Sequence, residues 1–276
     1  MILSSNLIRW KMFLASALLL GAWAGAAGGG GVGATAGGVQ SAVRRTSEPR
    51  GTASEVVMPF RIGEKLEYRV AWANLANAGL LELSVPERRD LLGWGTWHFR
   101  ATAHTSSLMR ALMAVDDQVD SYSDTATLES RQYETYLNEM GTTQNQILHF
   151  LPQGQAARGN FAGIVVAAGT RDPLGASYVL RGVDWQRIKE FRMPVFDGQD
   201  LYELRARLDA PSETVAVDAG NFDAAKISIH LFQREREVSG MNFFAWLAND
   251  SRHTPVLLEA EMPLGKFRVE LVSALQ

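Results

Sequence analysis

The sequence predicts a mostly β fold: a single large, curved antiparallel sheet or half barrel, with two or three short helices covering its apolar face. Three observations lead to this prediction. Apolar and polar residues alternate in many short segments, the connections between those segments are short, and the helical patterns are few and brief. Short connections and clean alternation are typical of an antiparallel meander with one face in water. A sheet of about ten strands twists by roughly 20° per strand pair, so it should curl or close.

Residues 1–27 have the pattern of a cleavable signal peptide. Arg9 and Lys11 precede a 16-residue apolar run that contains the cleavage patterns Ala22-Trp23-Ala24 and Ala24-Gly25-Ala26. The run is short for a membrane span, and an uncleaved signal anchor is the alternative. The chain contains no cysteine, so it lacks the residue that carries the lipid of a bacterial lipoprotein. We therefore expect an exported periplasmic protein that is neither a lipoprotein nor, after cleavage, a stable membrane protein.

After the signal peptide, the composition of the chain indicates a linker followed by one domain. Residues 28–57 are rich in Gly, Ala and Ser and have no strand or helix period, as expected of a flexible linker. Residues 58–276 contain no comparable break and are predicted to form a single β-rich domain. The net charge is −3, and loss of Arg9 and Lys11 with the leader makes it −5. This weak acidity does not suggest a nucleic-acid partner.

Alternation marks six strand-like segments in chain order, at residues 66–72, 81–85, 97–104, 202–209, 227–231 and 267–271. In the first, Leu66, Tyr68 and Val70 are expected on one face of the strand and Glu67 and Arg69 on the other. Turn-forming residues separate strand-like runs at 74–77, 197–198, 249–251 and 263–265. Each of these places is predicted to be a hairpin turn.

Two helices are expected to cover the apolar face of the sheet. The first is predicted over residues 106–114, where Leu108, Met109, Leu112 and Met113 recur at helical spacing and should turn inward as a lid. The second begins at Asp172-Pro173. An Asp at the N-cap followed by Pro at the first helical position is a common helix start, so capping is favoured over a catalytic role for this carboxylate.

Four stretches follow one another in a familiar order: PFRIGEKLEYRVAW at 59–72, AGLLELSV at 78–85, RDPLGASYVLR at 171–181 and WLANDSRHTPVLLEAEMPLGKFRVEL at 246–271. They resemble the bacterial exported family known as domain of unknown function 3108. The resemblance implies a periplasmic β-rich protein, with an architecture similar to the curved sheets of lipoprotein-carrier proteins. These motifs are structural in character, and the resemblance implies no catalytic residue.

Polar residues give little indication of chemistry. Asp116, Asp120 and Asp124 are predicted on one strand face with successive separations of about 13 Å, too far to share an ion. We expect them to be solvated or to form turns rather than to bind metal. His98 and His104 are expected at the surface. No metal-ligand spacing, nucleophile elbow or phosphate-binding loop occurs, so the sequence predicts no cofactor, no metal site and no catalytic site.

The remaining signal is apolar. Aromatic residues at strand spacing can simply fill a core, or they can line a cavity together with adaptable methionines. The candidate ligand-binding residues are Trp72, Trp97, Phe99, Leu108, Met109, Leu112 and Met113. The sequence thus favours a non-catalytic binding or carrier module for a lipid or another apolar, envelope-derived ligand. The alternatives are a structural envelope protein that has a solid core and binds a partner protein and, third, an enzyme acting on envelope polymers.

Overall fold

The described part of the chain comprises residues 58–151, 155–158, 164–263 and 265–275 of a computed structural model. The predicted signal peptide and linker, residues 1–57, lie outside the described residues.

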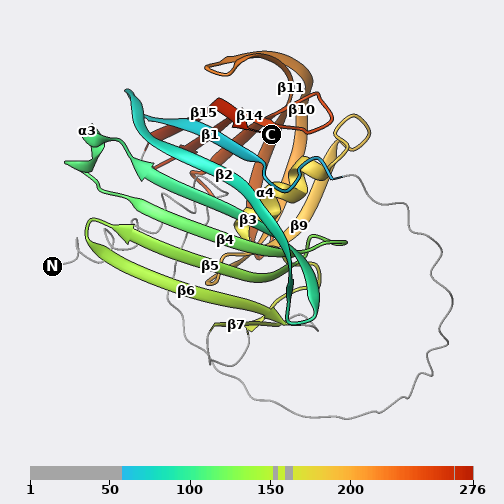
Figure 1. Ribbon diagram of the computed structural model, residues 1–276. Helices are drawn as coiled ribbons and strands as arrows, with labels where there is room; N and C mark the ends of the chain where they lie inside the picture. Colours follow the sequence, from blue (N-terminus) through green and yellow to red (C-terminus); the bar gives the residue numbers. More distant parts are fainter. Residues whose placement is uncertain (1–57, 152–154, 159–163, 264, 276) are drawn as a thin grey trace, which may run out of the picture.

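Fifteen strands of the described residues form one antiparallel sheet (Figure 1). The first eight are β1 (Lys65–Trp72), β2 (Leu75–Leu91), β3 (Trp94–Thr105), β4 (Asp116–Asp124), β5 (Ser130–Glu139), β6 (Thr142–Leu151), β7 (Gln155–Arg158) and β8 (Ile164–Val165). The others are β9 (Glu190–Phe196), β10 (Leu201–Val217), β11 (Gly220–Gln233), β12 (Arg236–Glu237), β13 (Asn242–Ala248), β14 (Pro255–Met262) and β15 (Gly265–Leu275). Their order is β8-β7-β6-β5-β4-β3-β2-β1-β15-β14-β13-β11-β10-β9, with β12 beside β11. The predicted large antiparallel sheet is confirmed.

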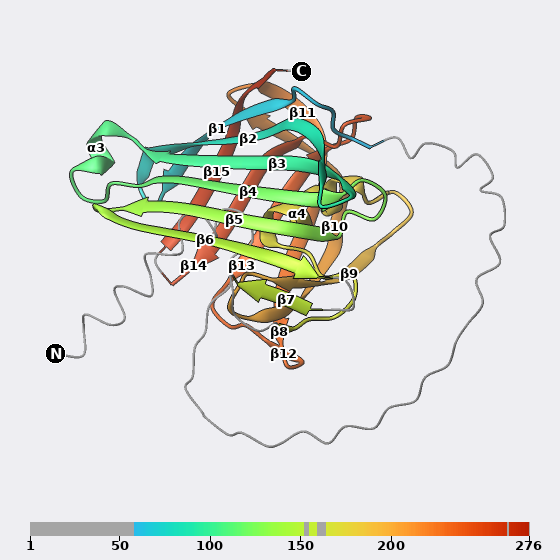
Figure 2. The same cartoon turned by 60° about the horizontal axis from the view of Figure 1, so that its bottom comes forward.

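The first and last strands of the domain pair at the centre of this sheet. β1 and β15 are antiparallel, with Val70 opposite Val269 and Lys65 opposite Leu275. The N-terminal half of the chain thus extends the sheet to one side and the C-terminal half to the other. Figure 2 shows strands β2–β6 crossing over β13–β15, so the sheet curves into two facing layers. The predicted curvature is therefore confirmed.

The concave face of the sheet carries the apolar side of the alternation. In β1, Leu66, Tyr68 and Val70 are buried on this face, as predicted. The first predicted turn, at residues 74–77, is misplaced. The chain turns at Ala73 and Asn74, where Ala73 has a left-handed backbone conformation (φ 50°), and β2 already begins at Leu75.

Helix α4 (Pro173–Gly182) lies between the two layers of the sheet (Figures 1 and 2). Its predicted start is confirmed: the Asp172 side chain accepts a hydrogen bond from the Gly175 N–H at 2.8 Å, and Pro173 opens the first turn. Neither helix of the described residues is both long enough and apolar enough to cross a membrane.

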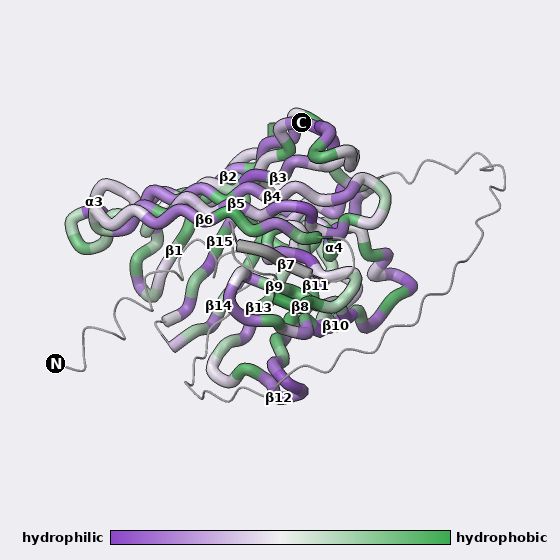
Figure 3. The backbone as a smooth tube through the Cα atoms, turned by 90° about the horizontal axis from the view of Figure 1, so that it is seen from below, coloured by the Kyte–Doolittle hydropathy of each residue, from purple (hydrophilic) through white to green (hydrophobic). Residues whose placement is uncertain are grey.

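The other helix, α3, differs from the prediction. It covers only Ser107–Arg110 and stands at the end of β3 rather than over residues 106–114. Met109 is 3 % exposed, but Leu108 and Leu112 are 70 % and 74 % exposed, so the expected inward orientation of these two leucines is wrong. A single turn at the end of a sheet buries only the side that faces β2 and β3. Figure 3 shows hydrophobic residues at this protruding α3 end.

Candidate functional site

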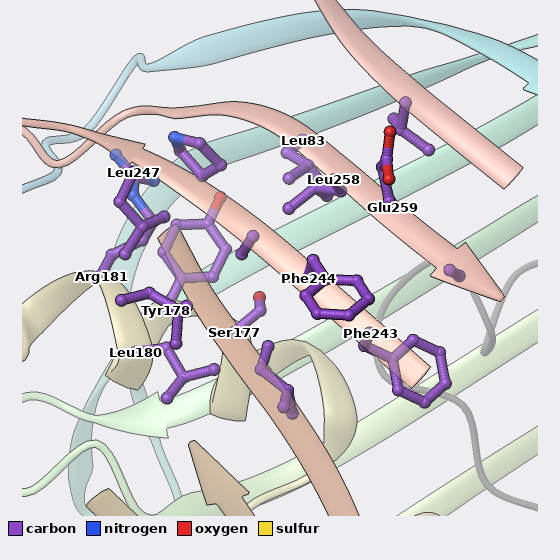
Figure 4. A pocket seen from close by; sticks show the side chains of 16 residues that line it. Leu83, Ser177, Tyr178, Leu180, Arg181, Phe243, Phe244, Leu247, Leu258 and Glu259 are labelled. Carbon is purple, nitrogen blue, oxygen red and sulfur yellow. The ribbon is translucent and has the colours of Figure 1, made fainter. Parts of the chain in front are cut away.

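An apolar pocket of about 70 Å³ lies between α4 and the concave face of the sheet (Figure 4). We call it the α4 pocket. Ser177, Tyr178, Leu180 and Arg181 contribute from α4. The strands contribute Leu83, Ile227, Ile229, Phe243, Phe244, Ala245, Leu247, Leu258, Glu259, Ala260 and Val269, and Pro255 begins β14. Strands from both halves of the chain therefore build one pocket.

The N-terminus of α4 is anchored to the sheet by a buried carboxylate. Asp172 accepts hydrogen bonds from the hydroxyls of Ser121 at 2.6 Å and of Ser130. Burial raises the pKa of Asp172, and the hydrogen bonds from Gly175 and the two serines oppose that rise. Gly175 permits a close approach to β4, since a Cβ there would stand 2.9 Å from the Ser123 hydroxyl oxygen. The helix therefore cannot shift at this end without breaking buried hydrogen bonds.

The C-terminal end of α4 is held by a buried ion pair. The Arg181 guanidinium donates to the Glu64 carboxylate, with 2.7 Å between Nη1 and Oε1. It also donates to the carbonyl oxygens of Pro59 at 3.3 Å and Arg252 at 3.2 Å. Arg181 thus lines the α4 pocket with its charge already neutralised, and the pocket surface remains apolar.

Aromatic stacking fixes the middle of α4. Tyr178 stacks on Phe99 with 3.8 Å between ring centroids. Phe60 meets Trp97, Phe99 and Tyr178 edge-on, with centroids 5.0, 5.1 and 5.2 Å away. Trp97 and Phe99 therefore belong to a packed aromatic cluster under α4.

A second, smaller apolar pocket lies under α3, at the far end of the concave face. This α3 pocket measures about 40 Å³. It is lined by Val70, Trp72, Ala78, Gly79, Leu80, Ala103, His104, Thr105, Met109, Met113, Val115 and Phe267. Two of these residues, Met109 and Met113, are methionines, which are unbranched and adapt to irregular shapes.

The structure separates the seven predicted site residues into three groups. Trp72, Met109 and Met113 line the α3 pocket, Trp97 and Phe99 lie in the aromatic cluster, and Leu108 and Leu112 are exposed. None of the seven lines the α4 pocket. The residues that do line it come from α4 and from strand positions, and no local pattern in the sequence marks them as a group. Only the pairing of β11, β13 and β14 and the placement of α4 bring them together.

The acidic face of β4 also differs from the prediction. Asp116, Asp120 and Asp124 do share a strand face, but Asp120 is 1 % exposed, so the solvated role is wrong for this residue. Asp120 lies 2.5 Å from the Nε2 of His98 and 2.7 Å from the Nε of Arg100.

Neighbouring side chains cover this part of the face. His98 is buried rather than at the surface, because its ring stacks on Tyr122 with 4.5 Å between centroids. The Arg89 guanidinium in turn lies over the ring of Tyr122, 4.5 Å from its centroid. Within the described residues, no three His, Cys, Asp or Glu side chains are arranged to hold a metal ion.

One solved structure supports the curved-sheet fold. A β-barrel-like protein of domain of unknown function DUF1849 from Brucella abortus superposes with a TM-score of 0.55 at 12% identity, covering 79% of this chain and 98% of that chain. A Bacteroides fragilis protein with a YmcC-like fold gives a TM-score of 0.35 at 11% identity, with coverages of 79% and 98%. No curated protein matches the sequence. The family profile described as protein of unknown function (DUF3108) matches residues 67–272, so the chain belongs to this family.

Proposed function

We propose that this protein is an exported, periplasmic, non-catalytic binding or carrier module that takes the apolar part of an envelope-derived ligand into the α4 pocket. The observation that carries the proposal is the unfilled apolar space between α4 and the concave face of the sheet. Protein interiors are close-packed and contain few voids larger than a water molecule. An apolar cavity stays dry and takes up apolar molecules, so this space is suited to a hydrocarbon group.

The size of the α4 pocket suits the end of a hydrocarbon chain. Its volume of about 70 Å³ is smaller than the roughly 150 Å³ of an engineered cavity that holds benzene. Ser177 and Leu258, which line it, are only half-buried. The Ser177 hydroxyl donates to the Leu174 carbonyl oxygen at 2.7 Å, so this side chain offers no unpaired donor to a ligand.

The carboxylates beside the pocket favour binding over catalysis. Glu259 accepts hydrogen bonds from Lys266 at 2.8 Å and from Arg268 at 2.7 Å, and these cations lower its pKa although burial opposes them. Glu64 is held by Arg181. Because its pKa is lowered, Glu259 is a poor proton acceptor for a bound substrate.

Filling the pocket tests the proposal. In the Ala245→Leu variant the added side chain should occupy the α4 pocket, so binding of octanoate, measured by isothermal titration calorimetry, should be lost while the free energy of unfolding is kept or raised. Ala206→Leu is the matched control. Ala206 is also buried on the concave face but lines neither pocket, so this variant should lose about 1–3 kcal/mol through overpacking and still bind octanoate.

Native mass spectrometry of protein purified from its own envelope is the second arm of the test, and we expect a retained lipid. Equal octanoate binding by wild type and Ala245→Leu would contradict the α4 pocket as the site. A wild-type protein that binds no octanoate and retains no lipid would contradict the binding function altogether. The structural envelope protein with a solid core would then be favoured.

A further inference from the structure

Two adjoining hollows lie over strands β9–β11, on the face of the sheet that points away from α4. One measures about 480 Å³ and the other about 380 Å³, and Arg192, Arg205 and Phe232 line both of them. We call the two hollows together the outer groove. Sites for small molecules typically measure about 300–1,000 Å³, so each hollow is large enough for such a ligand.

A row of basic side chains crosses the outer groove. Arg205 of β10 lies directly opposite Arg192 of β9 on one side and directly opposite His230 of β11 on the other. All three residues alternate with residues that are buried on the concave face, so they point to the outer face. Like charges directly opposite one another destabilise a sheet. The two arginines therefore need a negative charge near them.

One carboxylate serves both arginines. The Arg205 Nε donates a hydrogen bond to Glu203, and the Arg192 Nη1 lies 3.9 Å from the same carboxylate oxygen, Oε1. His230 has a different partner, since its Nδ1 lies 2.6 Å from the Oε1 of Glu237. Two guanidinium groups thus share one negative charge, and the row can accept a second anionic group.

Phe232 holds the central guanidinium in place. The Arg205 guanidinium lies over the Phe232 ring, with 3.7 Å between its Cζ and the ring centroid. A stacked, planar guanidinium loses little conformational freedom when it binds a phosphate or carboxylate in a bidentate manner. Arg205 is therefore the best-positioned anion-binding side chain of the row.

The charge of the whole groove favours a ligand with few anionic groups. Of the described residues, four arginines and four glutamates line the outer groove, so their formal charges cancel. A polyanion would be repelled by the four carboxylates, whereas hydroxyl groups can donate hydrogen bonds to them. A sugar with a single anionic group provides both kinds of contact.

An extended peptide does not suit this place. Peptides commonly bind a sheet by pairing with its edge strand, and β9 is the edge strand here. The Arg171 N–H already donates to the Pro194 carbonyl oxygen at 3.0 Å, and the Phe196 N–H donates to the Arg171 carbonyl oxygen at 2.8 Å. Proline also has no N–H to offer to a ligand. This part of the edge is therefore occupied.

We propose that the outer groove binds a sugar that carries a phosphate or carboxylate group, with the anionic group on Arg192 and Arg205 and the hydroxyls on the surrounding glutamates. The site is separate from the α4 pocket, because Ile229 lines that pocket on one face of β11 and His230 lies on the other face. The inference thus goes beyond the proposed function and does not depend on it.

Isothermal titration calorimetry with glucose 1-phosphate and with glucuronate tests the two anionic groups. At least one of these sugars should bind the wild type at least about tenfold more tightly than glucose or inorganic phosphate does, since each of the latter makes only part of the contacts. Arg205→Met should weaken binding of that sugar by at least about tenfold, because charge-assisted hydrogen bonds are lost.

Arg69→Met is the matched control. The Arg69 side chain is 33 % exposed, against 31 % for Arg205, and it also pairs with carboxylates, but it lies outside the outer groove. This variant should bind the sugar as the wild type does. If Arg205→Met does not fold, the more exposed Arg192→Met replaces it and should show the same loss.

Glu203→Gln should have the opposite effect. Removing the carboxylate that competes for the two guanidinium groups should tighten binding of inorganic phosphate by about two- to fivefold, the range expected for release of a partly exposed ion pair. A merely structural role of Glu203 would not raise the affinity, so an unchanged or weaker affinity would contradict the assigned contacts.

Three further outcomes would overturn the inference. The first is that neither anionic sugar binds, and the second is that both arginine variants bind the sugar as the wild type does. The third is that inorganic phosphate or a triglutamate peptide binds as tightly as the sugars, because the groove would then recognise only an anion. Octanoate binding should be the same in Arg205→Met and the wild type, so failure at the outer groove is distinguishable from failure at the α4 pocket.

Discussion

At the scale of single residues, the buried polar side chains are structural anchors. Asp172 is fully buried, yet its carboxylate accepts hydrogen bonds from one backbone N–H and two hydroxyls. The motif that contains Asp172 in the sequence therefore positions α4, and with it one wall of the α4 pocket.

Replacing Asp172 tests this anchoring role. Asp172→Ala should lower the free energy of unfolding by about 2–4 kcal/mol, because the cap is lost and buried donors lose their acceptor. Asp172→Asn should cost less, since its amide oxygen can still accept from Gly175. Urea denaturation gives both values. An Asn variant that folds normally but no longer binds octanoate would show that the carboxylate has a chemical role instead.

Asp117 should make stability depend on pH. Burial raises its pKa from 3.8 to about 6, against a hydrogen bond from the Asn138 N–H. The neutral form is therefore favoured in the folded state, so its contribution to stability is complete below about pH 4 and is lost as the pH rises through about 6.

The variant Asp117→Asn stays neutral at every pH. Relative to the wild type it should change stability little at pH 4 and should be more stable by up to about 3 kcal/mol above pH 7. Denaturation curves across this range measure the difference. A constant difference at all pH values would contradict a raised pKa for Asp117.

At the scale of elements, α3 shows how spacing alone misleads. The pairs Leu108/Leu112 and Met109/Met113 have the same i, i+4 spacing, and the sequence did not show that only the methionines line the sheet side. The single turn of α3 packs on the sheet with one side, and no other element of the described chain covers its outer side. The leucines therefore remain exposed.

This orientation predicts that shortening Met109 destabilises the protein much more than shortening Leu112. Met109→Ala should lower the free energy of unfolding by about 2–5 kcal/mol, because it enlarges a cavity in a buried site. Leu112→Ala should change it by less than about 0.5 kcal/mol, since the side chain already lies in solvent. Chemical denaturation of both variants measures the contrast. Equal costs would mean that the α3 segment packs differently.

At the scale of the whole molecule, distant segments meet at the C-terminal end of α4. Glu64 comes from the start of the domain, Arg181 from α4, and His253 from the β13–β14 connection, where its Nδ1 lies 2.6 Å from the Arg181 carbonyl oxygen. Burial opposes the charge of Arg181, but Glu64 is close enough that the pKa of Arg181 is raised on balance.

A double-mutant cycle tests this junction. Glu64→Leu or Arg181→Met alone should cost about 3–5 kcal/mol, because each leaves a buried charge or its hydrogen-bonding partners unpaired. The double variant should cost much less than the sum of the two, since both charges are then absent. Urea denaturation of the four proteins gives the coupling energy. Additive costs would mean that the ion pair does not join these segments.

The sequence by itself determined the strand faces, the start of α4 and the family. These features depend on local periodicity and on capping chemistry, which neighbouring residues specify. Tertiary structure decided which strands are partners, that β1 and β15 join the two halves of the chain, and that α4 lies between the two layers of the sheet. It also decided which apolar residues surround a pocket and which simply fill the core. Alternation tells which face of a strand is buried, but only strand register and helix placement determine whether the space beyond a buried side chain is filled.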